Sequence, residues 1–94
     1  MEILKTLKAH EKTIKSRFKV KRIGLFGSVV RGEARENSDV DVLVEFEEGF
    51  KTYDNYIELQ FYLEDTLGKR VDLVILEAVK HQLRAIIEKE AVYA

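Results

Sequence analysis

The chain has no cysteine and no proline among its 94 residues. Without cysteine it can form neither a disulfide framework nor a thiolate zinc site. It also lacks a run of roughly 18 apolar residues, the length that spans a membrane. Its N-terminus, where Glu2 and Lys5 interrupt a short apolar run, has no signal-peptide core. We therefore expect a cytoplasmic protein without a membrane partner, organised as one domain over residues 1–94.

The net charge is only −1, yet the charges are unevenly distributed along the chain. Residues 1–22 hold eight Lys/Arg against two Glu, whereas residues 33–65 hold eleven Asp/Glu against two Lys/Arg. A basic segment of this kind could bind nucleic acid, or it could be the solvated face of a helix that offsets an acidic half. We favour the solvated helix and do not expect a nucleic-acid partner.

Residues 25–32, Leu-Phe-Gly-Ser-Val-Val-Arg-Gly, predict a strand that ends in a tight turn followed by a short helix. A glycine here lets the backbone approach a ligand closely, and the first N–H groups of a helix point at an anion. Gly27 and Ser28 are therefore candidate phosphate-binding residues. Arg31 lies one turn beyond Ser28, where its guanidinium could bind phosphate, although it could instead pair with Glu33.

Three aspartates are candidate metal ligands. Asp39 and Asp41 are two residues apart at the start of an apolar strand pattern, so both should project from the same face. Carboxylates suit Mg²⁺, which commonly binds one or two of them together with the phosphates of a substrate. Asp72 lies in a further strand pattern, where a lone charge is costly without a partner. If the two strands pair, the three carboxylates meet at one end of a sheet and could serve a two-metal site.

The remaining sequence predicts the elements around this unit. Helical spacing indicates an amphipathic helix over about 2–18, a helix from a cap at Thr52 or Asp54 to about Leu67, and a final helix over about 79–90. Strands are predicted over about 22–26, 40–46 and 70–76. We expect a small mixed sheet with the helices against one face and the acidic face left open. In the final helix, the residues expected to face inward are Val79, Leu83, Ile86, Ile87 and Ala91.

Gly27-Ser28, Asp39-x-Asp41 and the distant Asp72 together resemble the pattern of the nucleotidyltransferase superfamily related to DNA polymerase β. The fuller sequence, FGSVVRGE at 26–33 and SDVDVLV at 38–44, is similar to the minimal nucleotidyltransferase (MNT) family, the antitoxins of HEPN/MNT toxin–antitoxin pairs. The resemblance covers essentially the whole chain. One departure is a valine at position 30, where alanine is common in the family; it does not change the chemical groups.

The resemblance implies an α+β protein with the polymerase β-like fold, a small mixed β-sheet with helices packed on one face. It also implies an adenylyltransferase that uses ATP and Mg²⁺ to transfer AMP to a tyrosine hydroxyl of a cognate HEPN ribonuclease toxin, as the antitoxin of a type VII-like pair. The residues implied in metal binding and catalysis are Asp39, Asp41 and Asp72. Those implied in nucleotide binding are Gly27, Ser28 and Arg31, of which Arg31 is also implied in catalysis.

Two alternatives of different class stay open. The chain could be an antitoxin that acts by stoichiometric binding with a vestigial site, in which case replacing Asp39 and Asp41 by asparagine would leave toxin neutralisation intact. It could also be a nucleic-acid-binding module or a transferase acting on RNA ends, with the basic first helix as its contact. Steeply salt-dependent binding to RNA would support that alternative.

Overall fold

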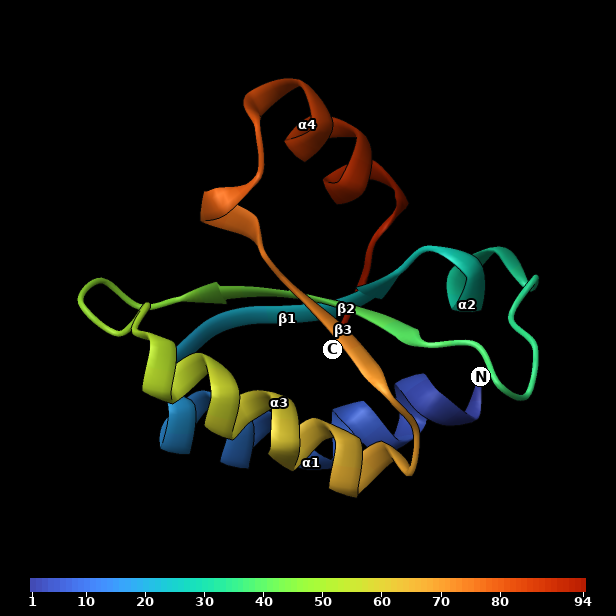
Figure 1. Cartoon of the computed structure of the whole chain (residues 1–94), viewed down its shortest axis with the longest axis horizontal. Helices are drawn as coiled ribbons and strands as arrows, with labels where there is room; N and C mark the ends of the chain where they lie inside the picture. Colours follow the sequence, from blue (N-terminus) through green and yellow to red (C-terminus); the bar gives the residue numbers. More distant parts are fainter.

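A computed structural model describes all residues, 1–94, and contains a four-stranded sheet with the strand order β3-β2-β1-β4 (Figure 1). The strands are β1 (Val20–Phe26), β2 (Val40–Phe46), β3 (Val71–Ile75) and β4 (Val92–Tyr93). β1 runs antiparallel to β2 and β4, whereas β2 and β3 are parallel. The mixed sheet confirms the predicted α+β class. The sequence did not predict β4, because two residues carry no strand pattern.

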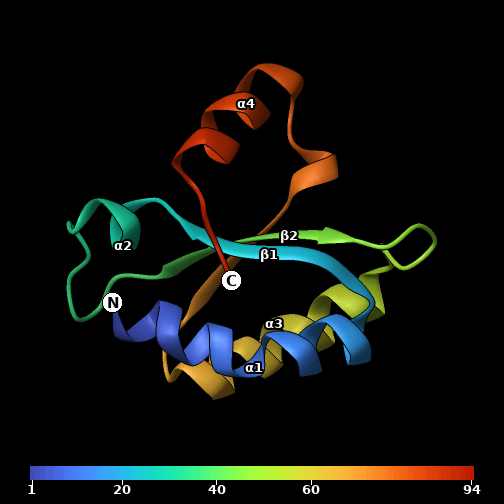
Figure 2. The same ribbon diagram turned by 180° about the vertical axis from the view of Figure 1, so that it is seen from behind.

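Two long helices, α1 (Glu2–Phe18) and α3 (Tyr53–Leu67), lie on one face of the sheet (Figures 1 and 2). α3 begins after Thr52, whose side-chain oxygen accepts a hydrogen bond from the Asn55 N–H at 3.2 Å, as the capping pattern predicted. Apolar side chains from both helices and from the strands form one cluster of 14 buried residues. The helical members are Leu7, Ile14, Phe18, Leu59 and Leu63.

α4 (His81–Glu90) lies on the opposite face of the sheet from α1 and α3 (Figure 1). It connects β3 to β4, the two edge strands of the sheet. The expectation that the helices lie against one face and leave the other open was therefore wrong for α4. Its predicted inward apolar face was only partly right, because Val79, Ile87 and Ala91 are half-buried whereas Leu83 and Ile86 are exposed. No residue of α4 is buried, and Leu83 and Ile86 are 53% and 64% exposed. Only two buried apolar side chains, Leu43 and Leu76, lie outside the core cluster, so α4 finds little apolar surface to cover. Neither α4 nor any other helix has the length and apolar character needed to cross a membrane.

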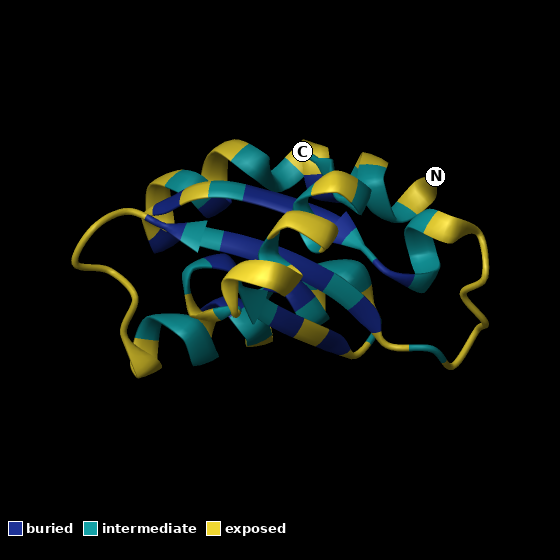
Figure 3. Ribbon diagram, turned by 90° about the horizontal axis from the view of Figure 1, so that it is seen from above, coloured by how far each residue is buried: buried dark blue, intermediate teal, exposed yellow.

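The strand register brings three segments of the chain to one end of the sheet. Phe26 lies opposite Asp41 in the β1–β2 pair, and Asp41 lies opposite Asp72 in the β2–β3 pair. The carboxyl end of β1 therefore lies beside the amino ends of β2 and β3. Buried residues concentrate in the strands, whereas the loop over residues 32–37, which borders this end, is exposed (Figure 3).

Candidate active site

The turn after β1 depends on a glycine. Gly27 is buried and has a φ of 76°, in the left-handed region that disfavours other residues. A Cβ placed on Gly27 would overlap the Oδ2 of Asp41 and lie 3.0 Å from its Cγ. The missing side chain therefore lets the backbone of the turn lie directly against the carboxylate of Asp41.

The short helix α2 (Ser28–Arg31) follows this turn and ends at Gly32. The Gly27 carbonyl accepts hydrogen bonds from the N–H groups of Val30 and Arg31, each at 3.1 Å, which closes the first turn. The Ser28 hydroxyl is half-buried and makes no hydrogen bond within the protein. It is free to bind a ligand at the start of the helix, and phosphate binding by Ser28 stays a prediction.

Asp41 and Asp72 lie side by side across the parallel strands, on the same face of the sheet. Burial raises the pKa of the Asp41 carboxyl, the negative charges of Asp72 and Asp39 raise it further, and Arg31 partly offsets them. The phenol of Tyr56, which donates to the Leu73 carbonyl at 2.8 Å, also has a raised pKa through burial and the charge of Asp72. Negative charge is thus concentrated at this end of the sheet.

Asp39 is turned toward Arg70, with 3.0 Å between Oδ1 and Nε. No three acidic or histidine side chains lie close enough together to form a ready-made metal site. The donor set nevertheless fits a hard divalent cation, because it consists of carboxylate oxygens and the like charges around Asp41 would be relieved by one. The Asp39–Arg70 pair is exposed, and such pairs are weak. Binding of Mg²⁺ by the three aspartates remains a prediction.

Arg31 pairs with two acids rather than standing free. Its Nε donates to the Oε1 of Glu33 at 2.7 Å, the structural pairing that the sequence left open. Its Nη1 donates to both carboxylate oxygens of Glu90, each at 3.1 Å. Hydrogen bonds to Glu33 and then to Glu90 raise the pKa of the Arg31 guanidinium, so it stays cationic.

Sequence reasoning missed Glu90, the last residue of α4. Its Oε1 accepts a hydrogen bond from the Gly27 N–H at 2.5 Å, across 63 positions of the chain. No local signal could have identified it, because it reaches the turn only through the path of α4 into the unpredicted strand β4. Glu90 therefore joins Gly27 and Arg31 at the site.

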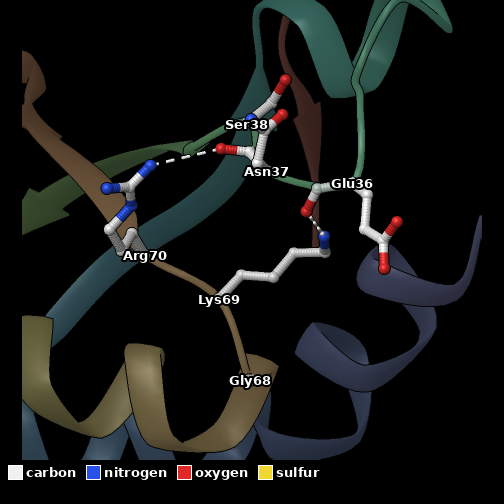
Figure 4. A pocket seen from close by; sticks show the side chains of 6 residues that line it. All are labelled: Glu36, Asn37, Ser38, Gly68, Lys69 and Arg70. Carbon is white, nitrogen blue, oxygen red and sulfur yellow. Dashed lines mark hydrogen bonds between the residues drawn. The ribbon is translucent and has the colours of Figure 1, made fainter.

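A polar cavity of about 420 Å³ borders the site (Figure 4). In it, Lys69 Nζ donates to the Glu36 carbonyl at 2.9 Å, and Arg70 Nη2 donates to the Asn37 carbonyl at 3.2 Å. These two bonds attach the loop before β3 to the loop before β2. They hold together the two chain segments that lead into Asp39 and Asp72. The lining residues are Glu36, Asn37, Ser38, Gly68, Lys69 and Arg70.

Comparison with known proteins identifies the fold and the family. The family model described as the nucleotidyltransferase domain matches residues 7–94. Protein adenylyltransferase MntA of Thermococcus cleftensis is 50% identical over 92 residues, which cover 98% of this chain and 92% of the relative. A solved structure assigned to the minimal nucleotidyltransferases superposes with a TM-score of 0.80 at 42% identity, covering 95% of this chain and 93% of the other.

A second solved structure, a toxin–antitoxin complex with AMP-PNP, contains a chain that is 27% identical, with a TM-score of 0.74. The superposition covers 99% of this chain and 72% of that chain. The chain belongs to the nucleotidyltransferase domain family of enzymes and groups with its minimal members.

Proposed function

We propose that this protein transfers AMP from ATP to a tyrosine hydroxyl of a HEPN-family toxin, with Mg²⁺ as its metal, and so acts as an antitoxin. The observation that carries the proposal is the row of Gly27, Asp41 and Asp72 across three neighbouring strand ends. A backbone turn suited to phosphate thereby touches a carboxylate suited to metal.

The phosphate-binding part of the proposal rests on the turn. The N–H groups at the start of α2 and the Ser28 hydroxyl would bind the β- and γ-phosphates, and the guanidinium of Arg31 would neutralise their charge. Because Gly27 lies against Asp41, a phosphate bound to the turn would lie next to that carboxylate. Two anions so close need a cation between them, which is the role of a divalent metal.

The metal-binding part rests on the aspartates. Asp39 and Asp41 would hold Mg²⁺ against the triphosphate, and Asp72 would complete a second metal position. When bound, Mg²⁺ neutralises phosphate charge and orients the α-phosphate. Asp39 would exchange its exposed partner Arg70 for the metal.

In the transfer step, the acceptor hydroxyl gives its proton to Asp72 and its oxygen forms a bond to the α-phosphorus. The bond from that phosphorus to the oxygen bridging the β-phosphate breaks, and pyrophosphate leaves. Positioning and charge neutralisation provide most of the acceleration.

The comparisons support the adenine nucleotide and the protein partner. A relative with 50% identity carries the name protein adenylyltransferase MntA, and a neighbour with 27% identity is part of a toxin–antitoxin complex with AMP-PNP. The tyrosine acceptor and Mg²⁺ rest on the family resemblance and on the carboxylate donors of the site.

The test is incubation with labelled ATP and Mg²⁺, with and without a candidate HEPN partner, followed by intact-mass analysis of both chains. We expect the partner to gain one or more AMP units. The Asp39→Asn/Asp41→Asn double variant should abolish this gain, whereas Asp65→Asn, at an exposed position without an ion pair, should preserve it.

Two outcomes would contradict the proposal. A stable complex whose toxin is neutralised without any mass change, and equally well by the double variant, would identify an antitoxin that acts by binding alone. Absence of a complex together with steeply salt-dependent RNA binding would identify the RNA-directed alternative.

A further inference from the structure

The carboxylate of Glu90 occupies the turn that the proposed function assigns to phosphate. One of its oxygens, Oε1, accepts hydrogen bonds from the Gly27 N–H at 2.5 Å and from Arg31 Nη1 at 3.1 Å. The other, Oε2, accepts from the same Nη1 at 3.1 Å. Glu90 thus binds a backbone donor and a guanidinium at the same time.

This donor set is typical of an anion site. A free N–H at the entry to a helix and an arginine fork are the groups that bind phosphate oxygens in proteins, and a carboxylate offers them oxygens of similar charge and spacing. The Gly27 N–H carries a single proton, which it donates to Glu90. A phosphate that binds this N–H must therefore displace Glu90 from it.

The attachment of α4 makes this displacement feasible. No residue of α4 is buried, and the helix is joined to the sheet mainly by ion pairs, such as Arg22 with Glu88 at 3.1 Å and Arg84 with Glu45 at 4.0 Å. β4 is anchored separately, through pairing with β1 and through the Ala94 N–H, which donates to the Ile23 carbonyl at 2.9 Å. Glu90 can therefore rotate away while the sheet stays intact.

We propose that Glu90 is a further residue of the nucleotide site, which holds the phosphate position in the free protein and competes with the triphosphate for it. The inference rests on the proposed function, because it takes the ligand at Gly27 and Arg31 to be a nucleotide phosphate. The apparent affinity for nucleotide then equals the intrinsic affinity multiplied by the fraction of molecules in which Glu90 has left the turn.

The test is calorimetric titration of the free protein with the Mg²⁺ complex of an ATP analogue in which a methylene group joins the α- and β-phosphorus atoms. Glu90→Gln keeps the size of the side chain and an acceptor for the Gly27 N–H but removes the charge that competes with phosphate. We expect it to bind the analogue about five- to tenfold more tightly than the wild type, as for a competing state populated at about 80–90%. Glu90→Ala should show the same direction.

The matched control is Glu33→Gln, which removes the other acid bonded to Arg31 but makes no contact with Gly27. It reports the general effect of one fewer negative charge beside Arg31, so its gain in affinity should be clearly smaller. Circular dichroism confirms that each variant is folded. If Glu90 merely supported the turn, its replacement would leave the affinity unchanged or lower it, and that result would overturn the inference.

Titration with inorganic tripolyphosphate separates the inference from the proposed function. If no variant binds the nucleotide but Glu90→Gln binds tripolyphosphate more tightly than the wild type does, the competition stands and the nucleotidyl-transfer function falls. If the nucleotide binds equally to wild type and Glu90→Gln, the function stands and the competition falls. If neither the wild type nor Glu90→Gln binds either ligand, both are overturned.

Discussion

Asp41 and Asp72 lie directly opposite each other in the parallel pair of β2 and β3, with both carboxylates on one face of the sheet. Burial and these neighbouring charges raise the pKa of Asp41. The folded, metal-free protein therefore holds like charges together at some cost in stability. Such costs are common where a site is arranged for a ligand rather than for the stability of the fold.

Asp41→Asn should stabilise the metal-free protein. Since folding raises the pKa of Asp41, the folded state binds that proton more tightly than the unfolded state, and stability is lost as pH rises through the ordinary and then the raised pKa. The asparagine removes this loss. In EDTA we expect a gain in the free energy of unfolding of up to about 1 kcal/mol near pH 7, limited by solvent screening at this partly exposed group.

Thermal unfolding from about pH 4 to about pH 7 measures this effect. The advantage of Asp41→Asn should be small at the acid end and grow toward neutral pH. Asp65→Asn, at an exposed position without an ion pair, is the matched control and should show no such growth. A variant that is less stable than the wild type at every pH would contradict the electrostatic interpretation.

Arg70→Gln should strengthen Mg²⁺ binding. Arg70 pairs with Asp39 at 3.0 Å and adds a positive charge where the metal is expected, so its removal frees a ligand and lowers repulsion. Because the pair is exposed, the gain should be at most about 1 kcal/mol, or about fivefold in affinity. Calorimetric titration with Mg²⁺ measures it. Arg35→Gln removes the same charge from a side chain without an ion pair and should change the affinity less.

The sequence predicted most of the site but not its last member. Hydrophobic periodicity located α1 over Glu2–Phe18 and β2 over Val40–Phe46. The sequence brought Asp41 near Asp72 only on the condition that their strands pair, and the structure shows that pairing. These features are local, or they follow from the period of a strand. Glu90 was missed because its contact with Gly27 spans 63 positions and depends on how α4 crosses the sheet. No residue pattern in α4 predicts how the helix crosses the sheet.

Gly27→Ala should destabilise the protein by more than Gly32→Ala, although both glycines have similar φ values, 76° and 75°. A methyl group at position 27 would overlap the Asp41 carboxylate, whereas nothing lies within 4 Å of the corresponding point at Gly32. We expect about 1 kcal/mol of backbone strain for Gly32→Ala and about 2–4 kcal/mol for Gly27→Ala. Urea unfolding measures both. Equal losses would mean that contact with Asp41 does not constrain the turn.

Arg22→Met should loosen α4 without disturbing the core. Arg22 donates to Glu45 at 2.8 Å and to Glu88 at 3.1 Å, and its guanidinium lies 5.1 Å from the ring centroid of Tyr93. It thereby links β1, β2, α4 and β4. Because the side chain is partly exposed, we expect only about 1 kcal/mol of destabilisation, but clearly faster hydrogen exchange in α4.

Exchange in α1 and α3 should stay as slow as in the wild type, since these helices pack on the other face of the sheet. Arg35→Met is the control for the loss of one arginine. If Arg22→Met also tightens binding of the ATP analogue, as Glu90→Gln is expected to do, the position of α4 determines how firmly Glu90 holds the turn. Unchanged exchange in α4 would mean instead that β4 alone fixes the helix, and that Glu90 moves only by rotation of its side chain.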